Sequence, residues 1–94
     1  MPEWQSRGHL EDHFTDHGPE VGARTVEEYD ASARIVVERA DIIFAYEDPT
    51  THLPRVGCYD SETGLFTALS DDDRWIVSHF RPHPDYIRNL IEED

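Results

Sequence analysis

The sequence contains no lysine, one cysteine and no long hydrophobic run. The single cysteine, Cys58, excludes an internal disulfide, so the fold does not need an oxidising compartment. No apolar segment approaches the roughly 20 residues that span a bilayer, and the N-terminal residues carry no signal-peptide pattern. The 94 residues predict one small domain, 1–94. We therefore expect a cytoplasmic protein, or a module once attached to something larger, with no membrane partner.

Basic side chains are also scarce. Eight arginines face 21 acidic residues, which gives a net charge of −13. Such a charge repels polyanions at long range, whereas affinity for nucleic acid normally comes from basic contacts to phosphates. A salt-rich cytoplasm, which screens the repulsion, and a basic partner protein both fit this charge. A nucleic-acid role must therefore depend on a local cluster of arginine and histidine.

Two helices are predicted in the first half of the chain. The first covers about Gln5 to His17, where Leu10 and Phe14 are four residues apart, and Gly18-Pro19 ends it. The second begins at the capping box Thr25-Val26-Glu27-Glu28. Its apolar residues then recur every three or four positions as far as Ala40, which predicts one buried stripe.

The second half of the chain changes to a period of two. It predicts four strands, Asp41 to Tyr46, Arg55 to Asp60, Leu65 to Leu69 and Arg74 to Phe80. The short links between them favour an antiparallel sheet, and Gly64 suits a turn that needs positive φ. A short helix is expected over Asp85 to Glu92. Helices followed by strands predict an α+β fold.

The most informative motif is a pair of histidines, His13 and His17. Residues four apart lie on one face of a helix, and imidazole titrates near neutral pH, so the pair can supply a general base and a general acid. That combination permits phosphodiester cleavage without a metal. The C-terminus of the helix favours a cationic His17.

Two other interpretations of the motif remain open. His9 shares the same helix face, so the row can instead bind a metal, with oxygen ligands from Asp12, Asp16 or Glu20. A simple polar surface row is the third interpretation.

The end of the fourth predicted strand carries a second group of candidates. Strand alternation puts Ser78 and Phe80 on one face and His79 and Arg81 on the other. If Phe80 packs under the helices, Ser78 lies on the side that the first helix covers. A bulge, or the strand end at Pro82, can turn Arg81 towards the cleft beside Ser78. Arginine is suited to bidentate phosphate binding. Taken singly, a surface arginine and a filler serine are the simpler interpretation.

These motifs together resemble a known family. His13 to Gly18, Glu20 to Ala23 and Thr25 to Tyr29 are similar to the opening of barnase-like domains of the barnase–EndoU–colicin–RelE superfamily. Tyr59 to Phe66 resembles their central hairpin, and Ser78 to Pro82 their closing strand. Such domains occur in bacterial polymorphic toxins and in phage-related proteins. The resemblance covers about residues 10–82, and it implies two N-terminal helices packed on a four-stranded antiparallel sheet.

The resemblance also implies an activity, that of a metal-independent endoribonuclease with no cofactor. A ribose 2′-hydroxyl attacks the neighbouring phosphate of RNA, with tRNA among the candidate substrates, and leaves a 2′,3′-cyclic phosphate and a 5′-hydroxyl. One of His13 and His17 would be the base and the other the acid. Arg81 would neutralise charge on the phosphate, and Ser78 would donate a hydrogen bond to it.

Three further residues are implied to bind the substrate, namely Tyr59, His79 and Phe80. Tyr59 would stack on a base or orient the phosphate. His79, if it shares the cleft, could replace one of the helix histidines.

The acidity of the chain keeps a non-enzymatic alternative open. A domain of the same fold without catalysis could act as an acidic interaction or regulatory module that docks on a basic partner. If the chain is a nuclease with a cognate inhibitor protein, that inhibitor should present a basic patch to so acidic a surface.

Overall fold

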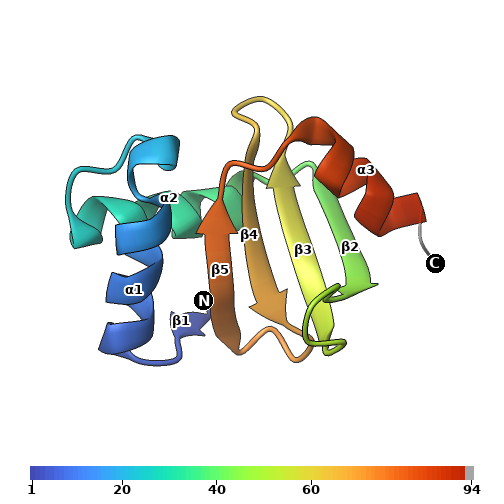
Figure 1. Ribbon diagram of the computed structural model, residues 1–94, viewed down its shortest axis with the longest axis horizontal. Helices are drawn as coiled ribbons and strands as arrows, with labels where there is room; N and C mark the ends of the chain where they lie inside the picture. Colours follow the sequence, from blue (N-terminus) through green and yellow to red (C-terminus); the bar gives the residue numbers. More distant parts are fainter. Residues whose placement is uncertain (93–94) are drawn as a thin grey trace.

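The computed structural model describes residues 1–92 as five strands and three α-helices. The strands form one sheet in the order β1-β5-β4-β3-β2 (Figure 1). Their bounds are β1 Glu3–Trp4, β2 Ile42–Glu47, β3 Pro54–Asp60, β4 Leu65–Ser70 and β5 Trp75–Phe80. The pairs β2–β3, β3–β4 and β4–β5 are antiparallel. Each of these four strands agrees with its predicted range to within one residue at either end.

The helices are α1 Arg7–His17, α2 Val26–Arg39 and α3 Pro84–Glu92, with a 3₁₀ turn η1 at Pro19–Val21. In Figure 1, α2 crosses behind the strands, α1 stands beside β5, and α3 lies at the β2 side of the sheet. The predicted α+β class and the short C-terminal helix are confirmed.

The sheet is larger than the four antiparallel strands that we expected. The two-residue strand β1 pairs in parallel with β5 and makes the sheet mixed. Two residues are too few to show any periodicity, and tertiary contacts hold them in place. The indole Nε1 of Trp4 donates to Asp30 (3.0 Å), and Arg34 donates to the carbonyl of Pro2 (2.9 Å).

The arrangement of the helices also differs from the expectation that both N-terminal helices pack on the sheet. Helix α2 does so, and it buries Tyr29, Ala33 and Val36. Helix α1 buries only Leu10 and partly buries Phe14. So thin an apolar stripe cannot cover a sheet face, and the histidine side of α1 lies along β5 instead.

Local capping explains where α1 begins and ends. Ser6 is the N-cap, because its Oγ accepts from the amide of His9 (3.0 Å), so the helix starts two residues later than predicted. It ends at His17 as predicted. Gly18 nevertheless keeps helical angles (φ −52°), and a Cβ there would lie 2.7 Å from the ring of Phe14. Close packing therefore requires this glycine, and the left-handed position is Gly22 (φ 80°).

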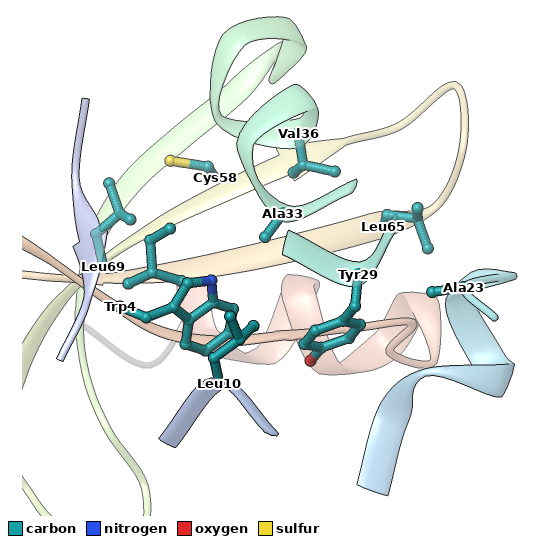
Figure 2. Close-up of a cluster of buried hydrophobic side chains, with 10 residues drawn as sticks. Trp4, Leu10, Ala23, Tyr29, Ala33, Val36, Cys58, Leu65 and Leu69 are labelled. Carbon is teal, nitrogen blue, oxygen red and sulfur yellow. The ribbon is translucent and has the colours of Figure 1, made fainter. Parts of the chain in front are cut away.

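The sheet has a hydrophobic cluster on each face. The cluster under α1 and α2 contains Trp4, Leu10, Tyr29, Ala33, Val36, Cys58, Leu65 and Leu69, among others (Figure 2). The cluster under α3 contains Tyr46, Phe66, Ala68, Ile87 and Leu90, with Phe80 packed against it. Ser78 pairs with Ala68 and therefore lies with Phe80 on the α3 face of the sheet, and not on the face under the N-terminal helices as expected.

Candidate active site

The three histidines of α1 run along β5. Their contacts are His9 Nε2 to the carbonyl of Val77 (3.0 Å), His13 Nδ1 to Oγ of Ser78 (3.4 Å) and the ring of His17 to the ring of Phe80 (5.5 Å between centroids). The spacing of the histidines along the helix matches the spacing of residues along the strand. Eight helical residues rise about 12 Å, and three strand steps cover about 10 Å. The row therefore stays in register with the strand.

His13 is the central member of the row. Its ring centroid lies 4.5 Å from that of His9 and 5.9 Å from that of His17, and the side chain is half-buried. Burial lowers the pKa of His13, and positive charge on the two neighbouring histidines lowers it further. At neutral pH this imidazole is therefore uncharged and able to accept a proton.

His17 is oriented by a carboxylate. Its Nδ1 lies 3.0 Å from Oε1 of Glu20, whose other oxygen, Oε2, accepts the amide of Arg81 (3.0 Å). Partial burial alone would raise the pKa of Glu20, but the hydrogen bonds and charges of His17 and Arg81 lower it below its usual value. Glu20 is therefore ionised at neutral pH, and it directs Nε2 of His17 away from itself.

Glu20 is a site residue that the sequence interpretation considered only as a metal ligand. The available signal was its position three residues after His17, across the Gly18-Pro19 turn. Spacing alone gave no indication that the same carboxylate reaches the strand end at Arg81, 61 residues further along the chain.

Arg81 lies at the exit of β5 with its guanidinium fixed by two main-chain carbonyls. Nε donates to the carbonyl of Glu20 (3.0 Å), and Nη1 donates to that of Thr63 (2.7 Å). Within residues 1–92 the Nη2 amino group has no hydrogen-bond partner. The side chain is exposed, so this group can bind an anion.

Tyr59 and Phe80 lie on the same side of the sheet as Ser78. Phe80 is half-buried, with its ring 5.5 Å from Phe66 and 5.7 Å from Tyr86. Tyr59 borders the β3–β4 turn beside Arg81, because a Cβ at Gly64 would lie 3.2 Å from Arg81 Nη1 and 4.0 Å from the Tyr59 hydroxyl. Phe80 thus contacts the histidine row at His17, whereas Tyr59 is two strands away on β3 and approaches only Arg81.

His79 lies on the opposite face of the sheet and is completely buried. Its Nδ1 donates to the carbonyl of Phe66 (3.0 Å), and its Nε2 accepts from the hydroxyl of Ser32 (2.8 Å). These partners hold the neutral ring, and burial lowers its pKa to about 4. The structure therefore does not bring His79 together with His13, His17 and Arg81.

No group of three or more His, Cys, Asp or Glu side chains suited to a metal ion occurs among the described residues. Within residues 1–92, no helix has both the length and the apolarity required to cross a membrane. Comparison with protein-family models, with curated proteins and with solved structures gives no match.

Proposed function

We propose that this protein is a metal-independent endoribonuclease of the barnase-like type, acting on RNA and cytoplasmic in location. The observation that carries the proposal is the meeting of α1 with the end of β5. His13 lies 3.4 Å from Ser78, and Glu20 joins His17 to Arg81. The sequence analysis assigned four residues to one reaction. Two of them, His13 and His17, are on α1, and the other two, Ser78 and Arg81, are at the end of the adjacent strand β5.

The different surroundings of the two histidines support distinct roles for them. His13, uncharged at neutral pH, accepts the proton of the ribose 2′-hydroxyl as that oxygen bonds to phosphorus. His17, held against the Glu20 carboxylate at the end of α1, donates a proton to the departing 5′-oxygen as the old P–O bond breaks. The products are a 2′,3′-cyclic phosphate and a 5′-hydroxyl, so protons and bonds balance.

The remaining groups stabilise the phosphate. Nη2 of Arg81 and the hydroxyl of Ser78 donate to the non-bridging oxygens, where negative charge grows in the transition state. Tyr59 and Phe80, on the same face, would contact the bases. Net charge opposes RNA binding, so we expect added salt to strengthen activity over the range in which it screens the acidic surface.

A second candidate is a non-catalytic module that docks on a basic partner. Two donors of Arg81 bind the carbonyls of Glu20 and Thr63. Such contacts also suit a purely structural arginine that fastens η1 to the β3–β4 turn. The net charge of −13 favours a basic protein partner.

An RNA cleavage assay separates the two candidates. A mixed pool of tRNA and single-stranded RNA is incubated with the protein in EDTA at low and high salt, beside His13→Ala and His17→Ala. His52→Asn is the control, because His52 is exposed in the β2–β3 loop and its positive φ (62°) suits asparagine.

The proposed function predicts cleavage that leaves cyclic-phosphate ends, is lost in both site variants and persists in the control. Absence of cleavage at either salt, from protein with native circular dichroism, would overturn it and favour the docking module. Cleavage that needs added metal would favour the histidine row as a ligand set.

A further inference from the structure

A hollow of about 270 Å³ lies at the start of β5, at the other end of the strand from Arg81. Its polar lining comes from Gln5, His9, Arg55, Ser70 and Trp75. Arg55 of β3 pairs with Ser70 of β4, and two residues further along Gly57 pairs with Ala68 on the α3 face. Residues two apart in a strand point to the same face, so Arg55 and Ser70 also lie on the α3 face. The hollow and Ser78 therefore share one face of the sheet.

Arg55 has a donor that the protein does not use. Its Nε atom is buried and has no hydrogen-bond partner among residues 1–92. The other contact of the guanidinium is a long one, from Nη1 to the carbonyl of Pro54 (3.4 Å). A buried donor without a partner costs free energy, and buried polar groups are nearly always satisfied. Nε itself is closed to an outside acceptor, whereas Nη2 has no hydrogen-bond partner among residues 1–92 and is not buried, so an acceptor from outside the chain can reach it.

No carboxylate lines this hollow, although the chain has 21 acidic residues. Each of four other hollows on the described surface includes at least one acidic side chain; examples, one from each, are Glu28, Glu47, Glu92 and Glu3. Two acids lie outside the lining: Asp48, whose carboxylate accepts the amides of Thr50 and Thr51 (2.8 and 3.0 Å), and Asp72, which accepts from the hydroxyl of Ser70 (2.6 Å). The hollow thus suits an anion.

Trp75 adds an aromatic surface to this cationic hollow. Its side chain is partly exposed, and the guanidinium of Arg74 lies 4.9 Å from its ring centroid. An indole ring next to guanidinium groups is the combination that binds a nucleobase together with its phosphate, since bases stack on aromatic rings irrespective of sequence.

The hollow is continuous with the candidate active site. His9 lines it, and the His9 ring stacks 4.5 Å from that of His13. A strand of RNA whose reacting phosphate lies at His13 would extend along β5 and bring a neighbouring nucleotide to Trp75.

We propose that this hollow is a second nucleotide-binding subsite, in which Arg55 and Gln5 hold a phosphate and Trp75 stacks on the attached base. The inference rests on the proposed ribonuclease function for its substrate class. Arg55 and Trp75 act in binding and do not touch the reacting bond.

A binding experiment tests the subsite without any cleavage. The protein is titrated in EDTA with adenosine 3′-monophosphate, and in parallel with adenosine and with inorganic phosphate. The NMR resonance of the Trp75 indole N–H reports contact, and calorimetry gives Kd. We expect the nucleotide to shift that resonance and to bind more tightly than either of its halves. Equal affinity for inorganic phosphate, or no shift at Trp75, would overturn the subsite.

Matched variants identify the groups responsible. Arg55→Gln should weaken nucleotide binding about ten- to hundredfold, as expected for losing a hydrogen bond to a charged group. Arg39→Gln, with the same charge change at the end of α2, should bind as the wild type does. Trp75→Leu provides a second test by calorimetry if Arg55→Gln does not fold. Unchanged affinity in the folded variants contradicts the proposal.

The kinetics separate this inference from the proposed function. On an RNA oligonucleotide, Arg55→Gln should raise KM and leave kcat unchanged. If the protein binds the nucleotide at Trp75 but never cleaves RNA, the subsite proposal is supported and the proposed ribonuclease function is contradicted. RNA cleavage with an unchanged KM in Arg55→Gln would keep the ribonuclease and reject the subsite.

Discussion

Nδ1 of His17 lies 3.0 Å from Oε1 of Glu20, just beyond the end of α1. The same carboxylate accepts the amide of Arg81 through its other oxygen. One side chain thereby fixes the last histidine of the helix against the end of β5. Because the Glu20 carboxylate is ionised, both of its oxygens act as acceptors, and His17 must present an N–H to it. Glu20 is thus a positioning residue for His17.

Replacing Glu20 with glutamine should disturb this arrangement. A glutamine side chain has an NH₂ donor in place of one of the two oxygens, so in this geometry one of the two contacts, to His17 or to the amide of Arg81, would lose its acceptor. We expect kcat for RNA cleavage to fall about ten- to hundredfold, the scale of a lost charge-assisted hydrogen bond. The ¹⁵N shifts of the His17 ring should change with it, because they report which nitrogen carries the proton.

Glu27→Gln is the matched control. It makes the same charge change at an exposed residue whose ion pair with Arg7 spans 3.4 Å, and exposed pairs of this kind contribute little. Wild-type kcat and unchanged His17 shifts in Glu20→Gln would show that the carboxylate does not position the histidine.

The proton affinity of His13 should depend on its neighbour. Positive charge on His9, stacked 4.5 Å away, helps to lower the pKa of His13 in addition to burial. His9→Gln removes that charge, and the new amide can still donate to the carbonyl of Val77. The pKa of His13 should therefore rise towards the ordinary value, while burial keeps it below. An NMR titration of the ring protons measures this, and an unchanged or lower pKa would refute the coupling.

Buried His79 should make the fold sensitive to mild acid. Its pKa is about 4 in the folded state, against about 6.5 for an unperturbed histidine. As the pH falls below 6.5, the unfolded chain takes up the proton first, so stability that is complete above 6.5 is lost towards pH 4. Linkage gives a loss of about 2 kcal/mol between pH 7 and pH 5. Urea unfolding at the two pH values measures it.

Variants assign that loss to a residue. His79→Gln should be less stable at pH 7, because Ser32 and the carbonyl of Phe66 lose a well-placed partner, but should lose less stability on going to pH 5. His13 adds to the loss in the same direction, since its pKa is lowered too. His52→Asn should lose as much as the wild type does. Stability that stays constant or rises from pH 7 to pH 5 contradicts the assignment.

Local sequence signals were sufficient for α2 and for four strands. Thr25 caps α2 as its capping box predicts, because its hydroxyl accepts from the amide of Glu28 (3.1 Å). Gly64 has the positive φ expected in the β3–β4 turn (76°). These elements follow from propensity, capping and periodicity, which act over a few residues.

Elements that depend on distant contacts could not be predicted in this way. Strand β1 has only two residues, and it exists because Trp4 and Pro2 bind to α2. The position of α1 beside β5 depends on the fit of three histidines to a strand about 65 residues away. Glu20 joins the site for the same reason. The sequence identified His13, Ser78 and Arg81 by residue type, whereas the contact of His13 with Ser78 and the link from Arg81 through Glu20 to His17 are tertiary properties.

A final pair of variants tests the packing on the α3 face, which holds Ser78 and Phe80. Gly57 lies under two aromatic rings, and a Cβ there would be 2.7 Å from Cζ of Phe44 and 2.8 Å from Cε1 of Phe66. The ring of Phe66 also packs on Phe80, so it cannot move freely. Gly57→Ala should therefore cost about 1–3 kcal/mol, as overpacking does.

Gly8→Ala is its counterpart in α1, where the nearest atom to an added Cβ is 3.9 Å away. Alanine within a helix is favoured over glycine by roughly 0.5–1 kcal/mol, so this variant should be more stable than the wild type. Urea unfolding of both measures the contrast. Equal stability of the two variants would mean that the aromatic rings over Gly57 can move aside at no cost in free energy. Rigid packing of the α3 face, on which Ser78 and Phe80 lie, would then be contradicted.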